Sequence, residues 1–178
     1  MFSLFDFDIT KYLRDYIEVN TYATPDLTMN HTLGSKLNQI RTSFPFLQYD
    51  TMESIMKISD YNKVARFYGN EEYSLNSNEY MIVADFKSMV EVRNIALKSN
   101  EEINLFGNTL KPKYDSCQDG FVEMSSNHIN TGIIIVPDNV IDEDYLIQNH
   151  LIGNYKTQDK NEITEIENNI NTLVKDPK

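Results

Sequence analysis

Residues 132–136 read Gly-Ile-Ile-Ile-Val, a continuous apolar run that predicts a strand in the interior of a sheet. A second buried strand is predicted over residues 79–84, Glu-Tyr-Met-Ile-Val-Ala. Helical patterns lie close to these strands, at residues 60–68 and 85–97. Short strands interleaved with helices are typical of the α+β class, so we expect a mixed β-sheet with packed helices.

Further strands are predicted on either side of this pair. Residues 52–58 and 121–124 have strand character, and residues 151–155 predict the last strand. Residues 103–111 predict a hairpin, because their central Gly-Asn pair suits a primed turn between two short β-type runs. Pro112 cannot donate a ladder hydrogen bond, which places the return strand near an edge of the sheet.

The two middle helices have recognisable start and stop signals. Ser59 is a candidate N-cap for the helix over residues 60–68, and Gly69 supplies a left-handed C-terminal stop. Asp85 is a candidate N-cap for the next helix, which ends at Ser99. Because caps and apolar spacing agree, we expect both segments to be helical.

Helices are also predicted near both ends of the chain. From Asp8 to Asn20 the apolar residues recur at helical spacing, with Asp8 as a candidate N-cap. Residues 159–174 predict a final helix with one apolar side. A shorter helical pattern precedes Pro45, with Leu33, Leu37 and Ile40 on one face. We expect one domain, residues 1–178, from which the two terminal helices project.

The chain is acidic, with a formal net charge of -11 over 178 residues. Such a charge repels phosphate backbones, which argues against a nucleic-acid partner, and it attracts cations or cationic peptides. A negative excess also keeps a domain soluble without any ligand, and the sign does not decide between these roles. Apolar residues make up 40% and charged residues 24%, which indicates a folded globular protein.

The cysteine content and the absence of targeting signals leave two alternatives for the cellular location of the protein. Cys117 is the single cysteine, so an intramolecular disulfide is impossible. The first residues lack the basic start and apolar run of a signal peptide. No apolar run approaches the roughly 20 residues that cross a bilayer. The alternatives are a protein soluble in the cell and a domain cut from a longer membrane protein.

Patterns for catalysis and metal binding are weak. His31, His128 and His150 do not stand at metal-ligand spacings. Cys117, His128 and Asn130 are the residue types of a papain-like site, but the order and flanking signatures of such a site are missing. No phosphate-binding loop or nucleotide fingerprint occurs. We therefore predict a recognition module without a cofactor rather than an enzyme, and keep a cysteine hydrolase as an alternative of another class.

Short charged clusters are the candidate binding residues. Asp142, Glu143 and Asp144 form the acidic cluster that we predict to face a ligand, and the alternative is that these side chains stay hydrated. Anionic lipid phosphates would need a basic patch instead. Lys111 with Lys113 is the candidate for it.

Two stretches resemble a known family. Residues 58–65 (Ile-Ser-Asp-Tyr-Asn-Lys-Val-Ala) and 78–85 (Asn-Glu-Tyr-Met-Ile-Val-Ala-Asp) resemble the extracellular part of an FtsX-like permease subunit. Residues 117–138, which include Ser126-Asn127-His128, resemble the later half of the same domain. The branch that the chain resembles is the bacitracin-export type of Firmicutes, whose ABC transporters confer resistance to bacitracin, nisin and related agents. The resemblance covers residues 52–140.

This resemblance implies a large extracellular domain between two consecutive membrane helices of a permease. The ATPase would be a separate subunit, and a sensor histidine kinase would respond to the transporter. The terminal helices would form a stalk toward the membrane, and Met1 would be an introduced start. Because the chain has no membrane helix or ATPase-coupling segment, transport itself would need the rest of the permease.

The leading hypothesis is a domain that binds a cationic peptide antibiotic, or the antibiotic bound to its lipid target, on the outer face of the cell membrane. Negative charge would enrich such peptides by electrostatic steering. The alternative is an FtsX-type adaptor that docks a protein such as a cell-wall hydrolase. These hypotheses differ in whether the domain needs an antibiotic to have a partner.

Overall fold

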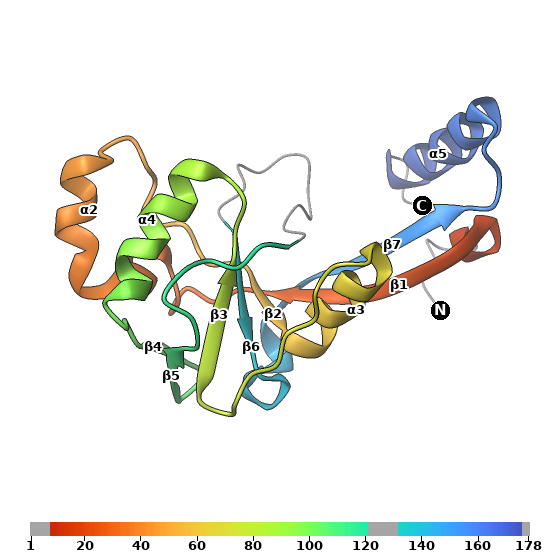
Figure 1. Ribbon diagram of the computed structural model, residues 1–178. Coiled ribbons are helices and arrows are strands. Elements are labelled where there is room, and N and C mark those ends of the chain that lie inside the picture. The colour runs from red at the N-terminus through yellow and green to blue at the C-terminus, as the bar shows by residue number, and fades with distance from the viewer. Residues whose placement is uncertain (1–7, 121–131, 176–178) are drawn as a thin grey trace. The chain divides into compact units, whose positions relative to one another are not determined.

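A computed structural model describes residues 8–120 and 132–175 of the chain (Figure 1). The helices and strands follow in this order: η1 Ile9–Tyr12, β1 Leu13–Tyr22, α1 Met29–Leu33, η2 Gly34–Lys36, α2 Leu37–Ser43, β2 Ile55–Lys57, α3 Ile58–Tyr68, β3 Glu79–Val83, α4 Lys87–Lys98, β4 Ile103–Leu105, β5 Asn108–Pro112, β6 Ile133–Val136, η3 Asp138–Val140, η4 Glu143–Tyr145, β7 Leu146–Tyr155 and α5 Lys160–Lys175. The strands form a seven-stranded mixed sheet in the order β4-β5-β3-β6-β2-β1-β7. The predicted α+β class is confirmed.

The chain forms two compact units, and the division falls within β1 and β7. The core unit is Val19–His150, and the terminal unit consists of Met1–Glu18 together with Leu151–Lys178. The core unit contains most of the buried apolar residues. In the terminal unit, Leu13 and Ile166 are the buried apolar residues among those that the structure describes.

The centre of the core unit is β6, the strand predicted from its continuous apolar run. It pairs in parallel with β2, where Ile134 lies opposite Ile55, and antiparallel with β3, where Ile134 lies opposite Ile82. Ile55, Ile82 and Ile134 all belong to one buried cluster. Figure 1 shows β3 and β6 side by side, to the right of α4. All four residues of β6 are at most 2% exposed, so both faces of this strand are covered, as its continuous apolar run predicts.

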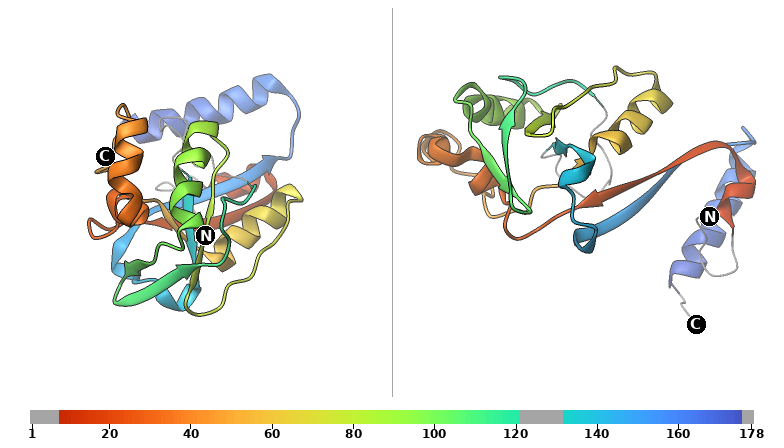
Figure 2. Two further views of the ribbon diagram at one scale, coloured as in Figure 1. Left: turned by 60° about the vertical axis from the view of Figure 1, so that its left-hand side comes forward. Right: turned by 90° about the horizontal axis from the view of Figure 1, so that it is seen from below.

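A second apolar cluster joins the helices of the core unit. Met29 and Leu33 of α1, Ile40 of α2, and Met89 and Val92 of α4 pack together in this cluster. Both views in Figure 2 show α2 close to α4. The predicted helical pattern before Pro45 is confirmed, although Gly34, with φ of +52°, separates α1 from the turn that leads into α2.

The predicted N-terminal helix over residues 8–20 is wrong. Asp8 does act as an N-cap, because its Oδ1 accepts the Thr10 backbone N–H at 3.0 Å, but the cap opens only the 3₁₀ turn η1. Leu13–Tyr22 is then the strand β1, whose Tyr22 pairs with Ile55 of β2. The β-branched and aromatic residues of this segment favour a strand, and sheet pairing decides the outcome over the helical spacing.

The middle helices are confirmed with shifted starts. Helix α3 begins at Ile58, with Lys57 rather than Ser59 at the N-cap, and Gly69 ends it with φ of +72°. Phe86, not Asp85, takes the N-cap position of α4. Neither cap residue makes a side-chain capping hydrogen bond, so the helices are held mainly by their buried faces.

The predicted hairpin is confirmed, but its turn lies one residue earlier. Phe106 and Gly107 both have positive φ, so they form the primed turn between β4 and β5. Pro112 ends β5, which lies one strand inside the edge strand β4. The predicted strand over 121–124 lies outside the described residues. The last strand is confirmed, but it begins at Leu146 instead of Leu151.

Candidate functional site

The acidic cluster of Asp142, Glu143 and Asp144 lies at the turn η4, directly before β7. Asp142 is the N-cap of this turn, because its Oδ1 accepts the Asp144 backbone N–H at 3.0 Å. All three residues are exposed at the surface of the core unit. The structure therefore brings the predicted cluster together, and whether it faces a ligand stays a prediction.

Glu143 differs from its two neighbours because it has partners. Its carboxylate accepts the Tyr22 hydroxyl at 2.7 Å and forms an ion pair with Lys57. Hydrogen bonds from Lys57 and Tyr22 hold the pKa of Glu143 below its usual value, and the bond to Glu143 raises the pKa of Lys57. Glu143 thus attaches η4 to β1 and β2. Asp142 and Asp144 are the other two exposed carboxylates of the cluster.

Three apolar side chains follow the acidic cluster and extend the candidate site. Tyr145, Leu146 and Ile147 are 37%, 45% and 62% exposed. The Tyr145 ring packs against Phe106, with the ring centroids 4.9 Å apart. These residues lie outside the last strand predicted from the sequence, which begins at Leu151. An aromatic residue followed by Leu-Ile was the available strand signal.

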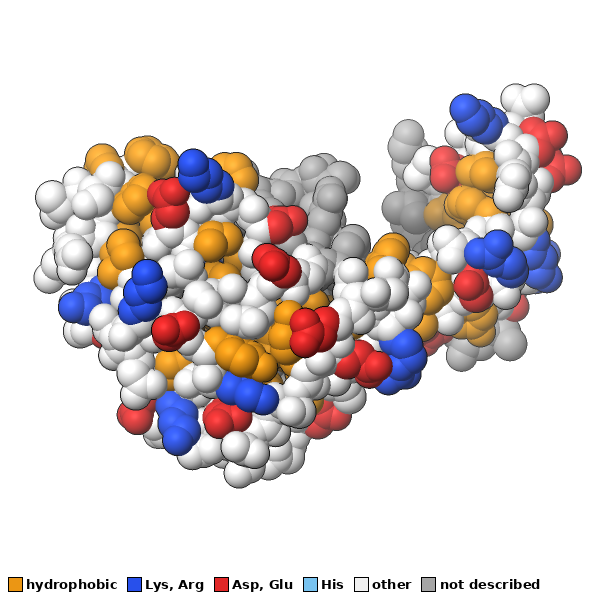
Figure 3. All heavy atoms as spheres, in the orientation of Figure 1, with side chains coloured by type: hydrophobic (Ala, Val, Ile, Leu, Met, Phe, Trp, Pro, Cys, Tyr) orange, Lys and Arg blue, Asp and Glu red, His pale blue; other side chains and the backbone are white. Residues whose placement is uncertain are grey.

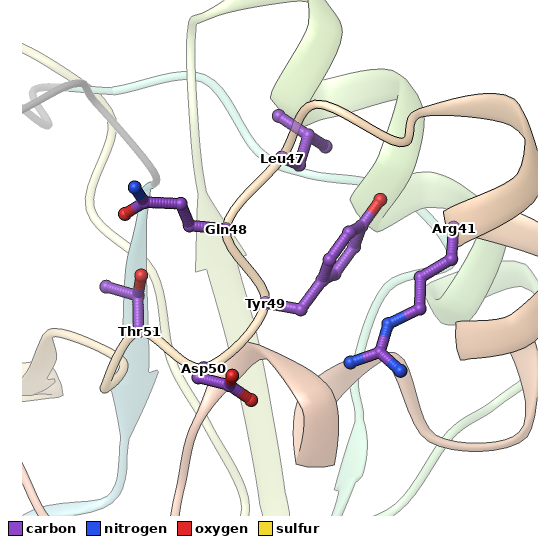
Figure 4. Close-up of a pocket in the computed structure, with 6 residues that line it drawn as sticks. All are labelled: Arg41, Leu47, Gln48, Tyr49, Asp50 and Thr51. Carbon is purple, nitrogen blue, oxygen red and sulfur yellow. The ribbon is translucent and has the colours of Figure 1, made fainter.

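A separate hollow of about 470 Å³ lies between α2 and the segment that follows it. Figure 4 shows Arg41 reaching from α2 toward Tyr49 and Asp50. Arg41 Nη2 donates to Asn30 Oδ1 at 3.0 Å, and Asn30 Nδ2 donates to Asp50 Oδ1. The guanidinium carbon of Arg41 lies 5.3 Å from the Tyr49 ring centroid. Asn30 thus bridges Arg41 and Asp50, which line the hollow with opposite charges.

The candidate basic patch is less available than the sequence suggested. Lys113 Nζ bonds to the Ser74 carbonyl oxygen and lies 5.4 Å from the Tyr114 ring centroid. Lys111 is exposed on β5. Figure 3 shows acidic and basic side chains interspersed over one face of the core unit.

The structure does not activate Cys117. Burial raises the pKa of its thiol to about 11, whereas a cysteine nucleophile needs a lowered pKa. The Cys117 backbone N–H donates to Asn94 Oδ1 at 2.7 Å. His128 and Asn130 lie outside the described residues, so their geometry with Cys117 is not defined. The thiol environment gives no support to the cysteine hydrolase alternative.

The two described histidines have local structural contacts. His31 Nδ1 accepts the Thr28 backbone N–H at 3.0 Å at the start of α1. His150 Nε2 lies 3.0 Å from Thr21 Oγ1, and burial lowers the pKa of His150. Within residues 8–120 and 132–175, no three His, Cys, Asp or Glu side chains are grouped as metal ligands.

Residues that carry the family resemblance have structural roles in the core unit. Asp60 Oδ2 accepts the Asn20 backbone N–H at 3.1 Å, which connects α3 to β1. The Asn62 side chain makes two hydrogen bonds with the Tyr73 backbone, at 2.8 and 2.9 Å. Tyr61, between them, is buried. These hydrogen bonds attach α3 to β1 and to the segment at Tyr73.

A buried ion pair was missed in the sequence. Arg93 of α4 donates two hydrogen bonds to the Glu53 carboxylate, at 2.8 and 2.9 Å, and both side chains are at most 2% exposed. Arg93 follows Met89 and precedes Leu97 by four residues each, and this spacing puts it on the buried face of the helix. The spacing was therefore a signal for burial of Arg93, although not for its partner.

No helix in the described part of the chain is both long and apolar enough to cross a membrane. Comparison of the sequence with protein-family models and with curated proteins, and of the fold with solved structures, finds no match.

Proposed function

We propose that this chain is the extracellular ligand-binding domain of an FtsX-like ABC transporter permease that confers resistance to cationic peptide antibiotics. A domain inserted between two consecutive membrane helices must leave the membrane and return to it at nearby points. The terminal unit supports the proposal because it joins the start of the first strand, β1, to the end of the last strand, β7.

This pairing of the two ends is the observation that carries the proposal. The Lys156 backbone N–H donates to the Tyr12 carbonyl at 2.9 Å, and Asn154 Nδ2 donates to Asp15 Oδ1 at 3.0 Å. Gly153 packs so closely against the Asp15 backbone that a Cβ atom there would lie 3.0 Å from its carbonyl oxygen. Neighbouring ends of this kind are what allow a domain to be inserted into another chain.

The acidic surface supports a cationic ligand. The net charge of -11 steers positively charged peptides toward the domain and keeps free phosphate away. On this proposal the domain senses or captures the antibiotic, and the ATPase subunit and sensor histidine kinase act through the rest of the permease. A peptide bound to its anionic lipid target would present only the positive charge that the lipid phosphates leave unpaired.

The test is calorimetric titration of the domain with nisin, with bacitracin and with analogues of the lipid intermediate. We expect binding that weakens as salt concentration rises, because screening reduces electrostatic steering and attraction. Absence of binding to both the domain and the intact permease would contradict the proposal. A stable protein partner captured without antibiotic would support the FtsX-type adaptor instead.

A further inference from the structure

The core-unit part of β7, residues 146–150, is an exposed edge of the sheet. Strand β7 ends the strand order, and on the side away from β1 no other described strand pairs with it. Its ten residues, Leu146–Tyr155, include no Pro, Lys or Arg. Natural proteins usually protect a sheet edge with such residues or with a very short strand, because unpaired backbone groups accept another strand. This edge has neither protection.

The side chains of the edge are apolar at its exposed end. Leu146 and Ile147 are consecutive, and successive residues of a strand point to opposite faces. One apolar side chain is therefore available on each face of the edge. Asn149 Nδ2 donates to Asn20 Oδ1 at 2.7 Å, which ties this part of β7 to β1. The edge is thus a fixed template with apolar contacts on both faces.

The charge around the edge selects the occupant. Asp142 and Asp144 are exposed just before the strand, whereas Glu143 is already paired with Lys57. No Lys or Arg occurs from Asp142 to Tyr155, and burial lowers the pKa of His150, the one histidine in this range. A second copy of this chain carries the same net charge of -11, and this repulsion disfavours self-pairing. A partner strand with basic side chains would complement them.

We propose that the edge of β7 over residues 146–150 binds an extended basic and apolar peptide as an added strand. Backbone hydrogen bonds to β7 supply affinity, and contacts with Leu146 and Ile147 supply selection for apolar side chains. Asp142 and Asp144 receive the basic side chains of the peptide. This inference rests on the proposed function and gives it a surface and a mode of binding.

The test uses the whole chain and a capped synthetic peptide of alternating Lys and Val, with binding measured by calorimetry. The variant Ile147→Lys adds charge and removes the apolar contact at the edge, and we expect it to weaken binding about tenfold or more. The matched control is Phe46→Lys, because Phe46 is 73% exposed in the core unit but lies outside β7. We expect the control to bind as the unchanged chain does.

Two further measurements test the mode of binding. The peptide is N-methylated at every second residue in two versions, one for each set of alternate backbone N–H groups. An added strand uses one set, so one version should lose binding and the other should keep it. The double variant Asp142→Asn/Asp144→Asn should weaken binding and reduce its dependence on salt.

Peptide binding that is equal for Ile147→Lys and Phe46→Lys would overturn the assignment to β7 and leave the proposed function in place. Equal binding of both N-methylated versions would overturn the added-strand mode. Concentration-dependent dimers that Ile147→Lys dissolves would assign the edge to a second copy of the chain. If nisin, bacitracin, the lipid-intermediate analogues and the synthetic peptide all fail to bind the chain and the intact permease, both proposals fail together.

Discussion

Arg93 and Glu53 show how one buried pair connects segments that are distant in sequence. Their two hydrogen bonds connect α4 to the segment that precedes β2. Spacing along α4 indicates that Arg93 is buried, but Glu53 is forty residues away and only the folded chain brings it close. Helical periodicity describes which face of a helix is buried, and it contains no information about which partner a buried charge will meet.

The change Arg93→Met should destabilise the chain by about 3–5 kcal/mol, because it leaves the Glu53 carboxylate buried without a compensating charge. The double variant Arg93→Met/Glu53→Leu should recover much of this loss, because apolar residues can replace a buried ion pair. Urea unfolding measures both. As a control, Glu72→Gln removes the exposed pair with Arg66 and should leave the midpoint unchanged. Equal losses in the single and double variants would contradict the prediction.

Cys117 tests the enzyme alternative at the same scale. Because burial raises the pKa of its thiol to about 11, the reactive thiolate is scarce at neutral pH. Alkylation by iodoacetamide should be slower in the folded chain than in urea, and its rate should keep rising as pH increases toward that pKa. Rapid alkylation of the folded chain near pH 7 would instead show an activated thiol and would revive the hydrolase hypothesis.

At the scale of elements, the sequence predicts correctly those strands and helices whose apolar pattern reflects a buried face. The prediction is wrong where pairing with a distant strand determines the secondary structure. Ile134 lies in a run that is apolar at every position, and this requires an interior strand whatever surrounds it. Tyr16 and Ile17 fit a helical period equally well, yet they belong to β1. The neighbouring strands of β1 come from distant segments, which local spacing cannot represent. The start of β7 also depends on pairing with a distant strand, so local spacing does not predict that Leu146 and Ile147 belong to it.

Gly34 and Gly69 both end a helix with positive φ, but their surroundings and their ψ differ. A Cβ atom at Gly69 would have open space, whereas one at Gly34 would meet the Glu101 carboxylate. Gly69 is in the left-handed α region, so Gly69→Ala should cost about 1–2 kcal/mol from backbone conformation alone. Gly34→Ala should cost more, because ψ of -127° places Gly34 outside that region and because Glu101, which bonds to Ser35, must also move.

Urea unfolding measures the stability of the two variants. The comparison is valid if the unfolding free energy falls with urea concentration at the same slope in both. In a Glu101→Ala background the extra cost of Gly34→Ala should shrink, since the carboxylate is gone, and the part that remains reflects the backbone at Gly34. An extra cost that does not change in that background would show that the contact with Glu101 contributes nothing to the difference.

At the scale of the whole molecule, the two units differ in the resources that stabilise them. The core unit has two large apolar clusters and a buried ion pair. The described part of the terminal unit has Leu13 and Ile166 as its buried apolar residues, together with polar contacts such as Tyr155 Oη to Glu167. Stability in a protein follows local burial and can differ widely between parts of one chain. The two units therefore differ in how much apolar surface they bury, and we expect the core unit to be the more stable one.

Hydrogen exchange should therefore separate the units. Backbone amides of β6 should exchange only through global unfolding, whereas those of α5 should exchange faster, through local opening of the terminal unit. The destabilising change Arg93→Met acts within the core unit, so it should speed exchange in β6 and leave α5 almost unchanged. If β6 and α5 instead exchanged with one free energy and both responded to Arg93→Met, the chain would unfold as a single cooperative unit. In that case, a peptide bound at β7 in the core unit would also stabilise α5.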